Sequence, residues 1–95
     1  MPDPTILVLA SLAGGDKHGY AIMEDTERFA GLRLRPGPLY GAITRLEERG
    51  WVAPVAAADR RRPYTLTGSG REYLEAPLGV LERLLKTAGR RLKHT

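Results

Sequence analysis

The sequence contains no cysteine, and histidine and serine occur only twice each in its 95 residues. Without cysteine there can be no disulfide, thiolate metal site or cysteine nucleophile. Neither His18 nor His94 lies in a pattern of His, Asp and Glu with metal-ligand spacing. The Gly-Ser-Gly sequence at 68–70 lacks the Gly-Lys-Ser/Thr ending of a phosphate loop, and no nucleophile motif is recognisable. We therefore expect neither an enzyme nor a bound metal or cofactor.

Long apolar segments are also absent. The apolar run in the N-terminal MPDPTILVLASLAGGD is shorter than the roughly 18 residues that a membrane helix needs, and no basic residue precedes it. It therefore predicts neither a membrane span nor a secretory signal. We expect a cytoplasmic protein with no membrane partner, folded around one small core.

The charge balance is basic. Fifteen Lys and Arg against eleven Asp and Glu give a net charge of +4 and a pI near 9.9, and a pI above about 9 is typical of nucleic-acid binding. Twelve of the fifteen are Arg, which suits two-pronged contacts to phosphate, although genome composition explains the general excess better. The distribution is more informative, because Arg60, Arg61 and Arg62 are adjacent and have only Asp59 beside them.

Two helices are predicted in the first third of the chain. The first covers residues 5–13, follows a capping Asp3 and a first-turn proline, and is apolar nearly all round. The second covers residues 17–29, with Asp16 as its cap and Gly31 after its end. Residues 32–34 alternate as a brief strand would.

A third helix is predicted from Pro36 to about Gly50, with four apolar residues on one face. Residues 51–55 and 63–66 then form two strands, and the three arginines lie at the bend between them. Pro54 and Pro63 would weaken a central strand, so the hairpin should be an exposed edge. A helix followed by a basic hairpin is the layout of a winged helix-turn-helix, in which the helix enters a DNA groove and the hairpin contacts phosphates.

A fourth helix is predicted from about Ser69, capped by Thr67 and interrupted by Pro77, with a kink near Ala76 or a new helix at the proline. Its apolar residues recur at spacings of 4, 3, 4, 3 and 4, which is typical of a coiled-coil seam. The seam predicts a homodimer. The expected dimerisation residues are Leu74, Leu78, Leu81, Leu85, Ala88 and Leu92.

These segments resemble, in order and in spacing, the PadR family of bacterial transcriptional regulators. The matching segments are His18-Gly19-Tyr20, Gly37-Pro38-Leu39-Tyr40, Arg45-Leu46-Glu47 with Gly50, the arginine-rich wing, Tyr64-Thr65-Leu66-Thr67 and Gly70-Arg71. The resemblance implies an α+β fold with a winged helix-turn-helix DNA-binding domain at residues 1–67 and a C-terminal dimerisation helix at 68–95. It further implies a repressor that binds inverted-repeat operators in double-stranded DNA and responds to a small aromatic effector. The last helix has no Trp, the residue type that sandwiches flat drugs in multidrug-binding relatives.

The candidate DNA contacts fall on three segments. In the third helix, Gly37 and Gly41 permit close approach, Thr44 can contact a thymine methyl or a phosphate, and Arg45 can bind guanine. Alternatively, Arg45 pairs with Glu48, and Tyr40 either binds a phosphate or packs on the second helix. The remaining candidates are the wing arginines Arg60, Arg61 and Arg62, together with Lys17 and His18 at the start of the second helix, where free N–H groups favour phosphate.

For two residues a purely structural role remains open. His18 can simply cap and pack, and Trp51 is either structural or the wall of a ligand pocket. A different function that the same basic face allows is a winged-helix module that binds an acidic protein partner.

Overall fold

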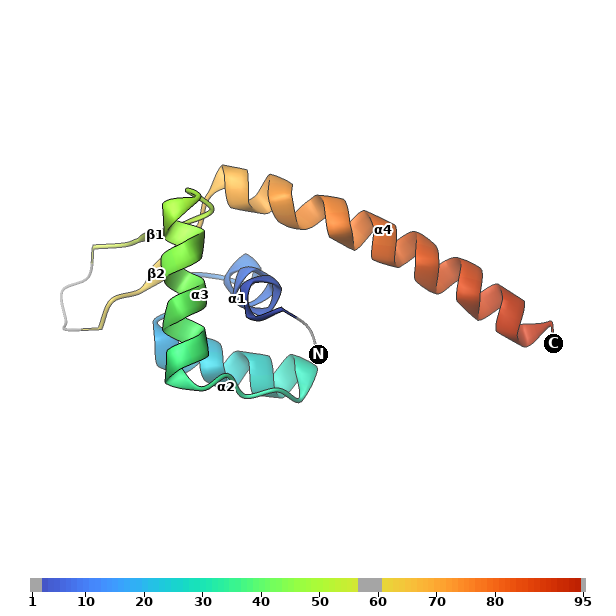
Figure 1. Cartoon of the computed structure of the whole chain (residues 1–95), viewed down its shortest axis with the longest axis horizontal. Helices are drawn as coiled ribbons and strands as arrows, with labels where there is room; N and C mark the ends of the chain where they lie inside the picture. Colours follow the sequence, from blue (N-terminus) through green and yellow to red (C-terminus); the bar gives the residue numbers. More distant parts are fainter. Residues whose placement is uncertain (1–2, 57–60, 95) are drawn as a thin grey trace.

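The computed structural model describes residues 3–56 and 61–94, and in that part of the chain four helices accompany a small antiparallel hairpin. Three helices gather around one core, the hairpin projects on one side, and the last helix projects on the other (Figure 1). The α+β winged helix-turn-helix prediction is thereby confirmed. The elements are α1 (Pro4–Ala13), α2 (Gly19–Ala30), α3 (Pro36–Glu48), β1 (Val52–Pro54), β2 (Tyr64–Leu66) and α4 (Gly68–Lys93).

Helix α1 lies at the centre, where it packs against α2, α3, β2 and the start of α4 (Figure 1). Its nearly continuous apolar sequence supplies side chains to all of these neighbours. Asp3 caps it as predicted, since its carboxylate accepts from the Thr5 backbone nitrogen at 2.8 Å and from the Thr5 hydroxyl at 2.7 Å. The buried apolar core consists of Leu7, Val8, Leu9, Leu12, Ile22, Leu34, Leu39, Ala42, Ile43, Leu46, Val52, Tyr64 and Leu74.

The predicted start of the second helix is wrong by two residues. Helix α2 begins at Gly19, and its cap is His18, whose Nδ1 accepts from the backbone nitrogen of Ala21 at 3.3 Å. Lys17 cannot be helical, because its backbone N–H and C=O both pair with Tyr64, at 3.2 and 2.9 Å. Asp16 therefore lies outside the capping position.

The brief strand expected at residues 32–34 is also wrong. Within the described residues this segment forms no strand, and its alternation has another cause. Leu34 is buried in the core, whereas Arg33 points outward, where it pairs with Glu27 at 3.0 Å and its guanidinium lies 5.5 Å from the ring centroid of Tyr20.

The hairpin, or wing, is shorter than predicted. Its register pairs Val52 with Leu66 and Pro54 with Tyr64, and one further hydrogen bond joins Val55 to the Pro63 carbonyl at 2.9 Å. The predicted tip lies largely outside the described residues, and Arg60 is among the positions not covered.

Helix α4 runs unbroken through Pro77, so the predicted new helix at that residue is wrong. Proline removes one backbone N–H, and the helical hydrogen bonds on both sides of it hold the segment together. Thr67 caps the helix as predicted, since its hydroxyl accepts from the Gly70 nitrogen at 3.0 Å. The resulting molecule is elongated, 56 × 25 × 19 Å, with α4 along its length (Figure 1).

Candidate nucleic-acid interface

Helix α3 has a buried face and an exposed face. Leu39, Ala42, Ile43 and Leu46 are all buried, as their helical spacing predicts. The opposite face carries Gly37 and Thr44, which are exposed, and Gly41, which is half-buried. The Thr44 hydroxyl donates to the Tyr40 carbonyl at 2.9 Å, and its oxygen can still accept a bond from a ligand. This face offers little bulk, so another surface can approach the helix backbone closely.

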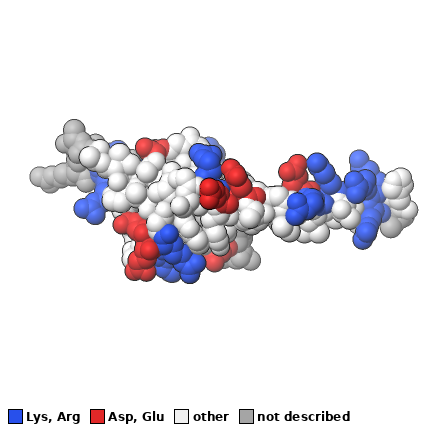
Figure 2. Space-filling model, turned by 90° about the horizontal axis from the view of Figure 1, so that it is seen from above, with Lys and Arg blue, Asp and Glu red and all other residues white. Residues whose placement is uncertain are grey.

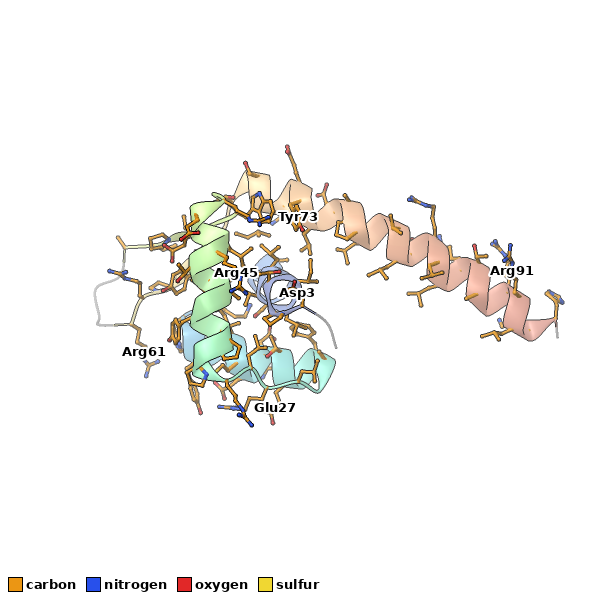
Figure 3. All side chains as sticks on the ribbon, viewed as in Figure 1. Asp3, Glu27, Arg45, Arg61, Tyr73 and Arg91 are labelled. Atoms are coloured by element: carbon orange, nitrogen blue, oxygen red, sulfur yellow. The ribbon has the colours of Figure 1, made fainter. Side chains whose placement is uncertain are left out.

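Arg45 lies on the flank of α3 that faces α1, away from the wing (Figure 3). Its positive charge contributes to lowering the pKa of Asp3, although the hydrogen bonds from the Thr5 hydroxyl and the Thr5 backbone are the larger causes. Among the ion pairs of the described residues, none joins Arg45 to Glu48. A carboxylate that lies near Arg45 is therefore that of Asp3, the N-cap of α1.

Arg45 also lines a small polar cavity of about 150 Å³ between α1, α3 and α4. One wall of this cavity is aromatic, because Trp51 and Tyr73 stack with their ring centroids 3.7 Å apart. Trp51 thus packs against the core and Tyr73, and it also borders a cavity. The cavity is lined by Asp3, Thr5, Arg45, Leu46, Arg49, Trp51 and Tyr73.

Tyr40 occupies the other flank of α3, where it lies over the first turn of α2. A Cβ atom at Gly19 would come within 2.8 Å of the Tyr40 Cζ, closer than real Cβ contacts allow. The glycine of the His-Gly-Tyr sequence is therefore required for this approach. Tyr40 remains 47% exposed, so it packs on α2 and still presents its ring to solvent.

A second, larger cavity of about 360 Å³ lies between the start of α2, α3 and the wing. Arg61 reaches from the wing toward the start of α2 (Figure 3), and its Nη1 lies 3.4 Å from the Nε2 of His18. Arg62 borders the same cavity and is exposed. The structure thus brings the predicted residues His18, Tyr40, Arg61 and Arg62 together, and adds Gly19, Tyr20 and Tyr64 to them.

Tyr64 forms the floor of this region from strand β2. It is 7% exposed, and burial is the main cause that raises the pKa of its phenol, with the Glu47 carboxylate adding to it and Arg62 opposing it. At neutral pH the phenol is therefore uncharged and can donate a hydrogen bond. Sequence analysis places Tyr64 in a strand and in the segment Tyr64-Thr65-Leu66-Thr67 that carries the family resemblance, but neither pattern indicates that it borders this cavity.

Lys17 does not join these residues. Its ammonium group donates to the carbonyls of Ser11 at 2.5 Å and Gly15 at 3.2 Å, and lies 3.8 Å from the Asp25 carboxylate. The side chain is only 20% exposed. These contacts fix the loop between α1 and α2, and the predicted contact of Lys17 with DNA stays a prediction.

Most of the expected dimerisation residues are exposed on α4. Leu74 is buried, because it is 5% exposed and belongs to the core of its own chain. By contrast, Leu85 is 72% and Leu92 is 75% exposed. The uncovered apolar residues of α4 are Leu78, Val80, Leu81, Leu84, Leu85 and Leu92, with Ala88 half-buried among them.

The far half of α4 is basic as well as apolar. In Figure 2, positive and negative side chains mix over the body of the molecule, whereas blue side chains predominate toward the end of α4. Glu82 pairs with Lys86 at 3.3 Å, and no acidic residue follows Glu82 in the sequence. No helix in the described residues is long and apolar enough to cross a membrane, and no cluster of His, Asp and Glu in that part of the chain could hold a metal ion.

Comparisons with known proteins agree with this geometry. Residues 8–76 match the model of the transcriptional regulator PadR-like family. A crystal structure of a PadR family transcription regulator from hypervirulent Clostridium difficile has the same fold, with a TM-score of 0.82 at 23% identity, over 96% of this chain and 99% of that one. A PadR-like transcription factor from Bacteroides fragilis gives a TM-score of 0.77 at 21% identity, over 90% and 86% of the two chains.

A relative with higher identity is an uncharacterised 37.1 kDa protein in transposon Tn4556 of Streptomyces fradiae, which is 48% identical over 82 residues. That match covers 86% of this chain but 24% of the relative, so the chain spans about a quarter of that protein's length. The family match itself covers well over half of the chain and includes α3, the wing and the start of α4. The chain therefore belongs to the PadR-like family of transcriptional regulators.

Proposed function

We propose that the protein is a repressor that binds an inverted-repeat operator as a homodimer and releases it in response to a small ligand. The observation that carries the proposal is the apolar stripe on α4, from Leu78 to Leu92, which the chain leaves exposed. Leucines at 72% and 75% exposure are unfavourable in water, and a second copy would cover them. Because the stripe and α3 lie on different parts of the molecule (Figure 1), dimerisation leaves the α3 helices of both copies available for DNA.

In this mode of binding, α3 enters the major groove and the wing contacts the backbone beside it. Two copies would place their reading helices about 34 Å apart, one turn of the duplex. Gly37, Gly41 and Thr44 give close approach to base edges, and Arg45 is the candidate for guanine. Arg60, Arg61 and Arg62 provide affinity through phosphates, independent of sequence.

Arg45 lines the cavity beside Trp51 and Tyr73, and this offers a route for an effector. The cavity of about 150 Å³ beside Trp51 and Tyr73 is comparable in size to cavities that hold a benzene ring. A small aromatic ligand with an acidic group could stack there and pair with Arg45 or Arg49. Binding would then hold Arg45 on the α1 side, away from DNA.

A gel shift on the DNA upstream of the protein's own gene tests the proposal, together with sedimentation at micromolar concentration. We expect a shift by a dimer. A monomer that shifts no DNA, and that retains an acidic protein in a pull-down, would favour the protein-interaction module instead.

A further inference from the structure

The end of helix α3 is fixed by backbone hydrogen bonds. Gly50 adopts a left-handed conformation, with a φ of 75°, and its N–H donates to the Glu47 carbonyl at 3.0 Å. The N–H of Trp51 donates to the Leu46 carbonyl, also at 3.0 Å. These two bonds form a Schellman motif. The carbonyls of Gly50 and Trp51 are thereby held in fixed positions directly after α3.

Thr67 contacts both of these carbonyls. Its backbone N–H donates to the Trp51 carbonyl at 3.0 Å, and its hydroxyl donates to the Gly50 carbonyl at 2.7 Å. The same hydroxyl accepts from the Gly70 N–H at 3.0 Å, which is the N-cap bond of α4. A hydroxyl can donate and accept at once. One side chain therefore joins the end of α3 to the first turn of α4.

Two further contacts lie on the same face of α4. A Cβ atom at Gly70 would overlap the Trp51 carbonyl oxygen, so any other residue there would force the backbone to move. Three residues further on, the ring of Tyr73 stacks on Trp51 with the centroids 3.7 Å apart. Positions three residues apart are neighbours on a helix surface. We call this group of contacts, made by Gly50, Trp51, Thr67, Gly70 and Tyr73, the α3–α4 joint.

Small changes of angle at the α3–α4 joint would have large effects on DNA reading. Helix α3 has 13 residues, so it is about 20 Å long, and its end lies at the joint. Tilting the body of the protein by about 10° relative to α4 would move the start of α3 by roughly 3 Å. That displacement is close to the 3.4 Å between neighbouring base pairs, and in a two-fold dimer it would occur in both copies.

We propose that Thr67 is a positioning residue, which fixes the angle between α3 and α4 and thereby the half-site spacing that the dimer accepts. The proposal rests on the dimeric mode of DNA binding proposed above and adds the residue that sets its geometry. Thr67 needs no contact with DNA, because it acts through the direction of α4. A helix cap alone would not require the hydroxyl to donate to Gly50.

Three substitutions separate the cap from the joint. Thr67→Asp keeps an N-cap acceptor for the Gly70 N–H, but an ionised carboxylate cannot donate to the Gly50 carbonyl. Thr67→Ser keeps both bonds and is the matched control. Tyr73→Ala loosens the joint through the ring stack and leaves Thr67 intact. The bond to Gly50 is exposed, so water can replace it and Thr67→Asp should fold, which circular dichroism verifies.

The distance between the two bodies of a dimer is the direct readout. Because the sequence contains no cysteine, Glu24→Cys introduces one spin label per copy, at an exposed position of α2. Helix α2 lies on the side of the body away from the start of α4 (Figure 1), so the label moves when the joint tilts. Double electron–electron resonance measures the distribution of label-to-label distances.

We expect one narrow distance distribution with Thr67 and with Thr67→Ser. Thr67→Asp and Tyr73→Ala should broaden or displace it by about 3 Å or more, the rise of one base pair. The change is expected in the free dimer, because the joint acts before DNA binds.

Operator spacing is the functional readout. Fluorescence anisotropy compares binding to the operator found by footprinting with binding to versions that have one base pair added or removed between the half-sites. The charge that Thr67→Asp adds affects all of these duplexes alike, so the ratio of their affinities isolates the effect of spacing. We expect Thr67→Asp to reduce this discrimination about threefold to tenfold, the effect of one lost hydrogen bond, and Thr67→Ser to retain it.

A Thr67→Asp dimer with unchanged distances and unchanged spacing preference would overturn the role of Thr67, while dimeric DNA binding would stand. A Thr67→Ser variant that loosens as Thr67→Asp does would overturn it as well. If Thr67→Asp does not fold, Tyr73→Ala decides, and an unchanged distribution in that variant would overturn the joint. A labelled protein without any intermolecular distance, or a wild type that shifts no DNA, would instead contradict the mode of binding on which the proposal rests.

Discussion

The indole of Trp51 and the ring of Tyr73 stack with their centroids 3.7 Å apart and their planes inclined by 18°. Trp51 precedes strand β1 and Tyr73 lies in the second turn of α4, so the contact joins the wing to the long helix. On the Trp51 ring lies the guanidinium of Arg49, 5.1 Å from the ring centroid. This cluster connects the C-terminal helix to the end of α3, and changes in one can therefore affect the other.

Tyr73→Ala should lower the free energy of unfolding by about 1 kcal/mol or more, because it removes the aromatic pair and its buried area. Thermal melting measures the loss. Trp51 is the only tryptophan, so its fluorescence reports on the same contact. Tyr73→Phe keeps the ring and should melt close to the wild type. Equal melting temperatures for the alanine and phenylalanine variants would show that the stack contributes no stability.

Gly70→Ala should be destabilising by about 2 kcal/mol or more through overpacking. A Cβ at this position would lie 2.7 Å from Leu66 Cδ1 and 2.9 Å from the carbonyl carbon of Trp51, and a backbone group cannot easily move aside. Gly89, in the same helix, has no atom near its potential Cβ. Gly89→Ala should therefore stabilise the helix by about 0.5 to 1 kcal/mol. Denaturant unfolding of the two variants measures both effects, and opposite signs are required.

Leu74 and Leu85 should respond differently although both belong to the predicted seam. Leu74 is 5% exposed, so Leu74→Ala should cost about 2 to 5 kcal/mol of stability in its own chain. Leu85 is 72% exposed, so Leu85→Glu should leave the helix content unchanged and shift the protein to a monomer. Circular dichroism and sedimentation velocity separate the outcomes. A Leu85→Glu variant that remains dimeric would place the interface elsewhere.

Stability should fall in acid because of Asp25. The hydroxyl of Ser11 donates to its carboxylate at 2.7 Å and, with the charges of Lys17 and Arg28, lowers its pKa below the ordinary 3.8. A carboxyl group whose pKa is lowered in the folded state stabilises the fold fully above the unfolded pKa. That contribution is lost as the pH falls from about 3.8 through the folded pKa. Melting temperatures from pH 7 to 2 should show this decline, and Asp25→Asn should make it smaller. An unchanged pH profile in Asp25→Asn would contradict the assignment.

Local signals in the sequence predicted much of this fold. The Thr67 cap, the Asp3 cap and the buried face of α3 depend on residues within a few positions of each other, and all are confirmed. The prediction of where α2 begins is wrong because Lys17 pairs with Tyr64. These two residues are distant in the sequence, so no local pattern reveals the contact. The spacing of the seam also could not distinguish Leu74 from its exposed neighbours, because Leu74 is buried by contacts with residues that are distant in the sequence.

In the candidate site, too, local sequence patterns identify residues, whereas the contacts between distant segments follow only from the fold. The arginine-rich wing and the His-Gly-Tyr sequence stand out as residues, but their meeting around one cavity depends on the packing of α2 against the hairpin. Arg45 was predicted on the exposed face of α3 with Glu48 as an alternative partner. Its proximity to Asp3 follows from the position of α1, which the spacing within α3 does not determine.

Footprinting on the DNA upstream of the protein's own gene tests the central claim most directly. A homodimer whose two α3 helices enter the major groove should protect two half-sites, related by inverted symmetry, with centres about one helical turn apart. Arg45→Ala should alter which bases are protected, whereas Arg61→Ala should weaken protection at every base equally. A single unpaired footprint, or no protection at micromolar protein, would contradict the account.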